Sequence, residues 1–413
     1  MAGVRLATML ILSVMIFTGC VTGDETPPTV GPPTATIVPL PTPSPTSGPP
    51  ATATYTAALD AILIPGPPLT APSDFFFLNE DDLWQQTGVG EARPALTERD
   101  IGPWVQTPDG SKVAVVIYDE GDEGTIEELR IVQPDLSLSE PIVVLTEAVD
   151  PVDTAITALA WSWDGNTLAV GRSDGTAVRI QNLSDPTTSP TSHPVALPGV
   201  PGTLDDMRWA PSGAGVAFLV EDDEERGSLF ITPNDEDARP VISSDGQTRA
   251  IQSFDWLAGR GRLVFVEQPS SAPTGAPGSI FTIAPDGTAL ELLVSSGQFA
   301  PAASVALLAP AWDGRQIAFT VHIPNANGEL VFQSLWVQTI DSGQLIELTI
   351  EPGYRVTDLW WTAAGLCWRG VDLGARGSAT SASYSGTEPF ILGRSNIEDG
   401  TSSVLYRSNP RTR

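Results

Sequence analysis

Hydrophobic and polar residues alternate along most of this chain, and the alternating runs occur in pairs separated by a turn. The segments WSWDGNTLAV (161–170), WAPSGAGVAF (209–218) and PAWDGRQIAF (310–319) share this pattern. Asp-Gly favours a tight turn, because Asp hydrogen-bonds the nearby backbone and Gly adopts a positive φ. Alternation on both sides of the turn is typical of strands that are buried on one face. Each segment is therefore predicted to be a β-hairpin.

The hairpins recur with a regular spacing. The apolar residue that opens the second strand returns about every fifty residues, which is typical of a repeat architecture; these residues are Val113, Leu168, Val216, Leu263, Ile317 and Leu366. Two more strand-like runs follow in each unit, as in SIFTIAPDGTALELLV (279–294). Four strands per unit predict an all-β β-propeller, in which each blade buries both faces against its neighbours.

The number of blades depends on the segment 74–97, DFFFLNEDDLWQQTGVGEARPALT. We interpret it as the last three strands of a blade without its first strand, which residues 55–64 or another segment would supply. It forms a seventh blade or completes the ring against the C-terminal unit. Seven blades are favoured, and six are the alternative. The propeller is expected over 74–408 with a tail at 409–413, a loop over 374–388, and residues 57–66 as the first segment to dock on the folded body.

Tryptophan recurs near the end of the first strand of several units, at Trp161, Trp209, Trp256 and Trp361. A large ring at this place fills the space between neighbouring blades. A platform on which carbohydrate stacks is the other interpretation of these side chains.

The turn phrases QTPDG, WSWDG and PAWDG, and strands such as LWVQTIDSGQLIELT, resemble the TolB-like and WD-repeat-like propellers over residues 74–408. The WD-repeat signature places Trp-Asp after the third strand, whereas Trp163-Asp164 and Trp312-Asp313 lie in the first hairpin turn. The TolB-like branch therefore fits better. The resemblance implies a fold and not a function, because propellers include scaffolds, binding proteins, hydrolases and lyases.

The N-terminal sequence MAGVRLATMLILSVMIFTGC resembles the signal peptide and lipobox of bacterial lipoproteins. The resemblance implies cleavage after residue 19, lipidation of Cys20 by acyl chains, and anchoring of the chain to a bilayer outside the cytoplasm. An ordinary secretory signal or an uncleaved anchor is the alternative. Residues 20–73 are rich in Pro and Thr, which favours an extended, disordered linker over a packed core.

The net charge of −29 changes the range of expected partners. Lys112 is the only lysine, and Arg carries almost all of the positive charge. Such a chain repels phosphate backbones, so nucleic acid is not expected as a partner. The acidity itself is typical of a solvated surface that keeps a protein, expected here to be a monomer, in solution.

The sequence contains no set of residues that predicts catalysis. His193 and His322 share no metal or triad spacing, and no nucleophile elbow or phosphate loop is present. Cys367 lies in an apolar run typical of a buried strand. We therefore expect no catalytic residue, no metal and no cofactor.

Three carboxylates remain as candidates for a binding site. Asp206, Asp255 and Asp358 precede the Trp of a first strand, with Arg208 and Arg355 nearby. First strands line the channel of a propeller, so these side chains are expected to converge at its mouth and to bind a ligand there. The alternative is that they satisfy the hydrogen bonds of strand ends.

Two classes of function follow from these observations. The favoured one is a membrane-anchored, extracytoplasmic propeller that binds a protein, peptide or glycan without catalysis. The alternative is a secreted propeller enzyme, a glycan hydrolase or lyase, that uses paired channel carboxylates.

Overall fold

The structure is a computed structural model, and it describes most of the chain from residue 72 onward. The described residues are 61–62, 72–79, 82–87, 91–97, 99–121, 124–146, 155–183, 191–195, 202–221, 227–233, 237–242, 250–268, 278–300, 303–325, 330–372 and 389–408.

Seven antiparallel sheets follow one another along the described chain, and we number them as blades 1 to 7. Blades 1 to 3 contain β1 (Asp74–Asn79), β2 (Asp82–Thr87) and β3 (Ala92–Leu96); β4 (Asp100–Gln106), β5 (Val113–Gly121), β6 (Gly124–Val132) and β7 (Val143–Thr146); and β8 (Ile156–Trp161), β9 (Leu168–Arg172), β10 (Ala177–Gln181) and β11 (Thr191–Val195). Blades 4 and 5 contain β12 (Thr203–Trp209), β13 (Gly215–Glu221), β14 (Gly227–Pro233) and β15 (Arg239–Ile242); and β16 (Ala250–Leu257), β17 (Arg262–Gln268), β18 (Ser279–Ile283) and β19 (Glu291–Val294). Blades 6 and 7 contain β20 (Ser304–Pro310), β21 (Gln316–Pro324), β22 (Leu330–Thr339) and β23 (Gln344–Leu348); and β24 (Tyr354–Thr362), β25 (Gly365–Asp372), β26 (Phe390–Ser395) and β27 (Ser402–Arg407).

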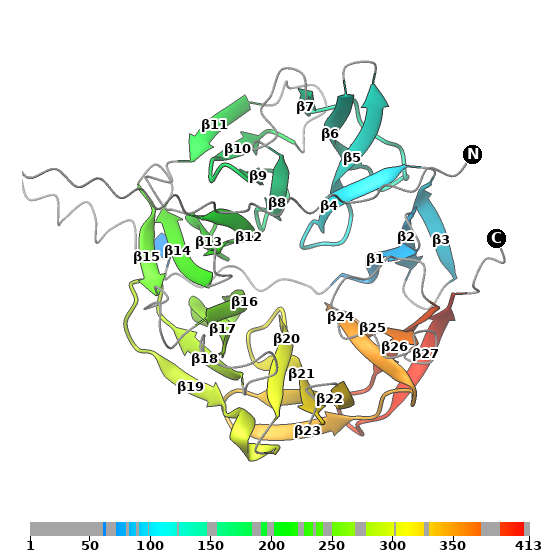
Figure 1. Ribbon diagram of the computed structural model, residues 1–413, viewed down its shortest axis with the longest axis vertical. Coiled ribbons are helices and arrows are strands. Elements are labelled where there is room, and N and C mark those ends of the chain that lie inside the picture. The colour runs from blue at the N-terminus through cyan, green and yellow to red at the C-terminus, as the bar shows by residue number, and fades with distance from the viewer. Residues whose placement is uncertain are drawn as a thin grey trace, which may run out of the picture. The chain divides into compact units, whose positions relative to one another are not determined.

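The seven sheets form a ring around one axis, with the first strand of each blade innermost (Figure 1). The first strands are the ones that line the central cavity of the ring. Helix is confined in the described residues to 61–62 and to the 3₁₀ turns η2 (Ala258–Arg260) and η3 (Ser296–Gln298). The prediction of an all-β propeller with seven blades is confirmed.

The Asp-Gly turns form as their sequence predicts. In the turn between β8 and β9, Gly165 has φ 64° and its N–H donates to the carbonyl of Ser162 at 2.9 Å. The Asp164 carboxylate accepts a hydrogen bond from the Ser162 hydroxyl at 2.6 Å and another from the Asn166 N–H at 3.0 Å. These bonds hold the hairpin closed while leaving the Asp164 side chain at the surface.

Blade 1 differs from the sequence prediction in which strand it lacks. Its first strand is present, since β1 is innermost, and the strand not seen among the described residues is the outer fourth one. The three phenylalanines of β1 explain the difference. Phe76 packs against blade 2 and Phe75 and Phe77 pack against blade 7, so both faces of β1 are covered, as an innermost strand requires.

The ring closes by side-chain packing between blades 7 and 1. Phe75 stacks on Trp360 with ring centroids 5.2 Å apart. Phe77 lies against Phe390 and Tyr406 at centroid distances of 5.8 and 5.9 Å. Among the described strands, none of one blade pairs with a strand of another. Aromatic contacts therefore provide the closure, and such pairs each add about 0.5–1.5 kcal/mol beyond the burial of their area.

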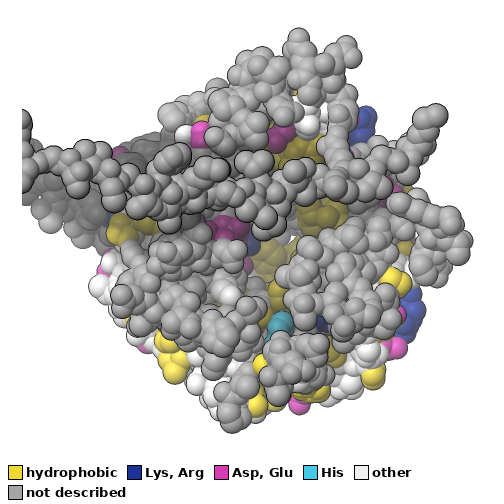
Figure 2. All heavy atoms as spheres, in the orientation of Figure 1, with side chains coloured by type: hydrophobic (Ala, Val, Ile, Leu, Met, Phe, Trp, Pro, Cys, Tyr) yellow, Lys and Arg dark blue, Asp and Glu magenta, His cyan; other side chains and the backbone are white. Residues whose placement is uncertain are grey.

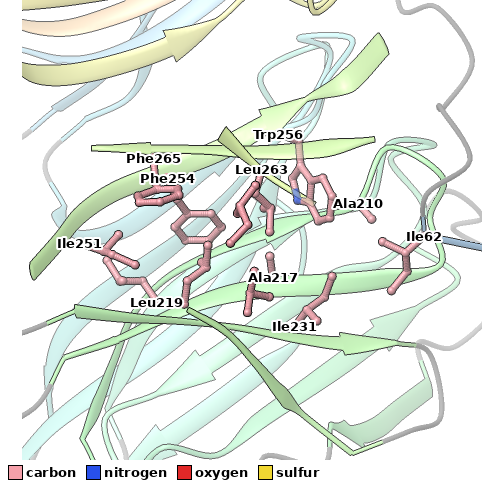
Figure 3. Packing of buried hydrophobic residues seen from close by; sticks show 13 residues of the cluster. Ile62, Ala210, Ala217, Leu219, Ile231, Ile251, Phe254, Trp256, Leu263 and Phe265 are labelled. Atoms are coloured by element: carbon pink, nitrogen blue, oxygen red, sulfur yellow. The ribbon is translucent and has the colours of Figure 1, made fainter. Parts of the chain in front are cut away.

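Ile62 lies well ahead of the first strand and yet is completely buried. It packs in one cluster with residues of blades 4 and 5, among them Ala217, Ile231 and Trp256 (Figure 3). Residues 61–62 are helical, so these two residues do not belong to a strand of blade 1. The position of Ile62 agrees with the expectation that residues 57–66 dock on the folded body.

Several sequence predictions fall on parts of the chain that the structure does not describe. They are the signal peptide at 1–19, Cys20, almost all of the linker at 20–73, the loop at 374–388 and the tail at 409–413. Within the described residues, no helix has the length and apolar character needed to span a membrane.

Candidate functional site: the central cavity

Every complete blade carries an irregularity in its innermost strand. The pairing of the first strand with the second shifts at one place in each of blades 2 to 7, as between Leu204 and Asp206 in β12 and between Val356 and Asp358 in β24. A β-bulge redirects the side chains around it and increases the local twist. The bulges therefore decide which side chains of these strands face the axis.

The recurrent tryptophans connect neighbouring blades. The indole N–H of Trp209 donates to the carbonyl of Ala160 in blade 3 at 2.9 Å, and that of Trp361 donates to the carbonyl of Ala309 in blade 6 at 2.8 Å. Trp161 and Trp256 make the equivalent bonds at 3.1 and 3.3 Å. In each case the acceptor is the residue just before the position that corresponds to the tryptophan on the first strand of the adjacent blade. The interpretation of these rings as packing between blades is therefore correct.

A cavity of about 670 Å³ occupies the centre of the ring. Its size lies within the range of about 300–1,000 Å³ that is typical of small-molecule sites. Its lining contains most of the 11 tryptophans of the chain, namely Trp104, Trp161, Trp163, Trp209, Trp256, Trp312, Trp360 and Trp361. Trp161, Trp209 and Trp256 are themselves almost fully buried, so the aromatic rings that a ligand can reach belong to the other five.

Two tryptophans from opposite sides of the ring meet at one end of this cavity. Trp163 lies in the first hairpin turn of blade 3 and Trp312 in that of blade 6, and their ring centroids are 6.0 Å apart in an edge-to-face arrangement. Their indole N–H groups donate to the carbonyls of Trp209 and Trp361 at 2.9 and 2.8 Å. We call this end, where the first hairpin turns lie, the hairpin end. The two rings cross the axis there and narrow the cavity at that end.

All of the charged side chains in the described lining come from two adjacent blades. They are Asp205, Asp206 and Arg208 on β12 of blade 4 and Asp255 on β16 of blade 5, and we call them the charged wall. Arg208 forms an ion pair with Asp206, and its guanidinium also donates to the carbonyl of Met207 at 2.8 Å. On the face shown in Figure 2, acidic and basic side chains lie next to each other at the central hollow, beside hydrophobic ones.

Burial dominates the electrostatics of the charged wall. It raises the pKa of Asp206 to about 6, although Arg208 and the N–H of Met207, at 2.8 Å, act in the opposite direction. Burial also raises the pKa of Asp255, against the influence of Arg208 and of the Trp256 N–H at 2.7 Å, and it raises the pKa of Asp205. The three carboxylates are thus less well stabilised in their charged form than they would be in water.

These groups are recessed without being cut off from water. The side chain of Asp206 is 28% exposed and that of Arg208 is 38% exposed. Asp205 is exposed. A ligand that enters the cavity can therefore reach the charged wall directly.

The structure brings only part of the predicted site together. Asp206, Asp255 and Arg208 line the cavity, whereas Asp358 and Arg355 are not among its lining residues. Asp358 accepts a hydrogen bond from the hydroxyl of Thr357 at 2.8 Å and lies 3.8 Å from the guanidinium of Arg369. The structure thus brings Asp206, Asp255 and Arg208 together without placing the other two beside them, and ligand binding by these side chains stays a prediction.

The reason for the difference lies on the second strand. Asp206 and Asp358 each come directly after the bulge of their own blade, but Asp206 is paired with Leu219 while Asp358 is paired with Arg369. An arginine opposite the carboxylate offers it a partner within the blade. Asp206, opposite a leucine, forms its ion pair with Arg208 on its own strand.

The remaining reactive side chains lie elsewhere. Cys367 is a buried free thiol, and burial raises its pKa to about 11. His322 accepts a hydrogen bond from the amide nitrogen of Gln333 at 2.7 Å, and burial together with Arg355 lowers its pKa to about 4. His193 belongs to β11. No group of three or more possible metal ligands occurs in the part of the chain that the structure describes.

Sequence reasoning missed three members of the site. Asp205 is the bulge residue of β12, and a bulge cannot be read from a single strand sequence. Trp163 and Trp312 did give a signal, since both occupy the same place in the first hairpin turn of blades three positions apart in the ring. That equivalence would have placed both rings at one end of the axis.

No protein-family model matches this chain, and no curated protein matches it. Among solved structures, one from a study of two prolyl endopeptidases matches with a TM-score of 0.56 and 13% identity, covering 88% of this chain and 53% of that one. TolB from Agrobacterium tumefaciens matches with a TM-score of 0.44 and 12% identity, covering 66% of this chain and 84% of that one. TolB from Acinetobacter baumannii matches with a TM-score of 0.44 and 12% identity, covering 67% of this chain and 63% of that one.

The fold and the site together define the class of this protein. It is a seven-bladed β-propeller with an aromatic central cavity that carries charge on one side. The chain spans about half the length of the prolyl endopeptidase that it matches. At 13% identity this likeness concerns the fold alone, and the activity of that enzyme does not carry over to this chain.

Proposed function

We propose that this protein is a lipid-anchored, extracytoplasmic β-propeller that binds a protein, peptide or glycan partner in its central cavity without chemically changing it. The observation that supports this function is the cavity itself. It combines several aromatic and apolar lining residues with a few charged groups that can orient a ligand, which is the usual composition of a binding site. The protein acts as a monomer, and Cys20 carries its acyl anchor.

The composition of the lining supports binding rather than covalent chemistry. Among the described lining residues there is no Ser, Cys, His or Lys, and the ionisable side chains there are the three carboxylates and one guanidinium of the charged wall. The buried thiol of Cys367 is protonated at neutral pH and packs in the interface between blades 7 and 1.

Selection from libraries tests this function. The chain from residue 20 onward, in its unlipidated Cys20→Ser form so that Ile62 and Pro72 stay in place, is immobilised and probed with a displayed peptide library and a glycan array. Specific ligands are expected, and they should lose affinity when Trp360, a cavity residue, is replaced by Ala. Replacement of Trp336, which lies away from the cavity on β22, is the matched control. Ligands that bind both variants as well as the wild type would show that the cavity is not the site.

A glycan hydrolase or lyase is the second candidate, and one observation favours it. The pKa of Asp206 is raised to about 6, Asp255 lies close enough to contribute to this shift, and a pair of carboxylates is the catalytic set of most glycosidases. Incubation of selected glycans with the protein, followed by mass spectrometry, separates the two functions. Shortened or unsaturated products that disappear in Asp206→Asn would establish the enzyme, while unchanged glycans support binding alone.

The anchor makes a prediction of its own. Membrane affinity grows by about 0.8 kcal/mol for each buried CH₂ group, so two or three acyl chains on Cys20 would hold the protein at the membrane essentially permanently. Cys20→Ser is expected to move the protein from the membrane fraction to the soluble secreted fraction, or to leave an unprocessed precursor, with the propeller still folded. A wild-type protein that is mainly soluble, with a mature N-terminus other than Cys20, would contradict the anchor.

A further inference from the structure

We propose that the central cavity binds a basic side chain, lysine or arginine, of a partner polypeptide, with its cationic group at the charged wall and its aliphatic stem against the tryptophan rings. This inference rests on the proposed function, because it takes the cavity to be a binding site, and it names the chemistry of the ligand.

The first step is the contrast between two sides of the cavity. Blades 4 and 5 contribute the charged wall, which consists of three carboxylates and one guanidinium. Blades 7, 1 and 2 contribute uncharged, mostly apolar side chains to the same lining, among them Trp360, Phe75, Leu78 and Trp104. A ligand that fits both sides needs one charged end and one apolar part. A neutral apolar ligand would leave the carboxylates buried without a further partner.

The second step is the sign of the charge. Arg208 is the only cation in the described lining, and it forms its ion pair with Asp206. Asp205 and Asp255 also lie within the influence of this one guanidinium. The wall therefore has two negative charges in excess, in surroundings that already disfavour the charged carboxylates. A second cation between Asp206 and Asp255 would lower this cost, whereas an anion would raise it.

The third step concerns the aromatic surface. Trp360 is only partly buried, and it is held in place by the stacked ring of Phe75 at 5.2 Å. Lysine and arginine bury an aliphatic stem on such rings while the charged end remains with polar groups.

The fourth step is the direction of entry. The contact between Trp163 and Trp312 narrows the cavity at the hairpin end, while Asp205 is exposed near the start of β12, toward the opposite end. A polypeptide therefore enters from the end that carries the bulges and inserts a side chain or a terminus. The volume of about 670 Å³ accommodates such a side chain together with the backbone that carries it.

Binding of short peptides tests the proposal by isothermal titration calorimetry at low ionic strength. The probes are acetylated pentapeptides with alanine at four positions and lysine, arginine, norleucine or glutamate at the centre. Spermidine is a further probe, for a free polyamine. The lysine and arginine peptides are expected to bind, about tenfold or more tightly than the norleucine peptide, and the glutamate peptide is expected not to bind. If spermidine binds more tightly than either basic peptide, the proposal that the cation belongs to a polypeptide would be overturned.

The variant Asp206→Asn/Asp255→Asn is expected to bind the lysine peptide with an affinity about tenfold or more lower than that of the wild type. The control Asp286→Asn/Asp313→Asn removes the same number of charges from exposed turns and should leave the affinity unchanged. Equal affinity for the lysine and norleucine peptides would overturn the proposal that the ligand is cationic. Unchanged affinity of Asp206→Asn/Asp255→Asn for the lysine peptide would overturn it as well. Selected ligands that need Trp360 but carry no basic residue would overturn this inference while the proposed function stands.

A second measurement does not depend on whether the double variant folds. Carbodiimide couples a small amine to accessible carboxylates of the wild-type protein, and the modified residues are identified by mass spectrometry. Because Lys112 is the only lysine, the chain offers few amines of its own for this reaction. The arginine peptide with an amidated C-terminus, which offers the reagent neither an amine nor a carboxylate, is expected to protect Asp206 and Asp255 and to leave Asp286 and Asp313 as reactive as before. Equal labelling with and without the peptide would contradict binding at the charged wall.

Discussion

Single side chains hold the blades of this propeller to one another. Four tryptophans repeat one hydrogen bond from blade to blade, and in each case the acceptor is a backbone carbonyl that the neighbouring blade leaves free at its inner edge. The same residue type thus supplies both the bulk that fills the space between blades and the donor that satisfies the carbonyl. This pairing explains why tryptophan, and not phenylalanine, recurs at the position.

Trp209→Phe separates these two contributions. The substitution keeps an aromatic ring between blades 3 and 4 but removes the donor to the buried carbonyl of Ala160, 2.9 Å away. We expect the free energy of unfolding to fall by about 1–3 kcal/mol, the cost of an unsatisfied buried acceptor, as measured by urea unfolding. The control is Trp336→Phe, where the acceptor is the rotatable hydroxyl of Ser334 on the same strand. A smaller loss for Trp209 than for Trp336 would contradict the role of the bond between blades.

His322 gives the fold a dependence on pH. Its pKa is about 4 in the folded protein and 6.5 in its ordinary state, because burial and Arg355 disfavour the charged ring. Its Nε2 atom accepts from Gln333, whose amide also bonds the backbone of Val356 on blade 7. As pH falls from about 7 to 4, the unfolded chain takes up a proton that the folded ring does not, and up to about 3 kcal/mol of stability is lost.

The substitution His322→Gln removes this proton uptake. Wild type and variant are compared by urea unfolding at pH 7 and at pH 4.5. The advantage of the wild type over the variant is expected to shrink or reverse at the lower pH. A difference in stability that is the same at both values would show that His322 does not titrate in this way.

At the scale of the strand, the sequence predicts the repeating parts well and the exceptions poorly. Alternation and the Asp-Gly turns locate the hairpins, because both depend on residues close together in the chain. The three phenylalanines of β1 were assigned to the wrong place in the blade, since only the packing of two neighbouring blades shows that both faces of this strand are covered. Asp358 was assigned to the cavity because the residue that faces it across the strand pair, Arg369, lies beyond the reach of a local pattern.

One strand position allows no side chain at all. In β26, a Cβ atom at Gly393 would overlap the buried indole ring of Trp368 on the paired strand β25. That ring cannot move away easily, because its N–H donates to the hydroxyl of Ser395 at 3.1 Å and it is only 1% exposed. The close approach of ring and backbone is what keeps blade 7 compact at this point.

Gly393→Ala is therefore expected to lower the free energy of unfolding by about 1–3 kcal/mol, the usual cost of overpacking. Thermal or urea unfolding provides the measurement. Gly297→Ala is the matched control, since the nearest atom to its Cβ is the Ser295 hydroxyl oxygen at 3.6 Å. If Gly393→Ala were as stable as this control, the overlap with Trp368 would not limit the packing of blade 7.

At the scale of the whole molecule, stability depends on the ring being closed. Every blade contributes both of its faces to clusters shared with its neighbours, including the cluster between blades 7 and 1 that contains Phe75, Phe77 and Phe390. An open ring would expose two such faces to water, and each of them carries several large apolar side chains.

Truncation after residue 350 tests this dependence. It removes blade 7 and uncovers Phe75 and Phe77 on blade 1 together with Leu335 and Val337 on blade 6. We expect the whole domain to lose its cooperative unfolding transition and its near-ultraviolet circular dichroism rather than one blade alone to be lost. A soluble truncated protein with a cooperative transition would show instead that the blades are stable independently.

Because the ring is closed by side-chain packing, the order in which the blades follow one another along the sequence can be changed. Because none of the described strands is shared between sheets, each blade is encoded by one uninterrupted stretch of sequence. In the order of the described sheets, the break between β27 and β1 is thus equivalent to the connection between any two neighbouring blades. Joining the present ends with a linker and opening the chain between, for example, β15 and β16 would give a circular permutant in which every sheet keeps all of its strands.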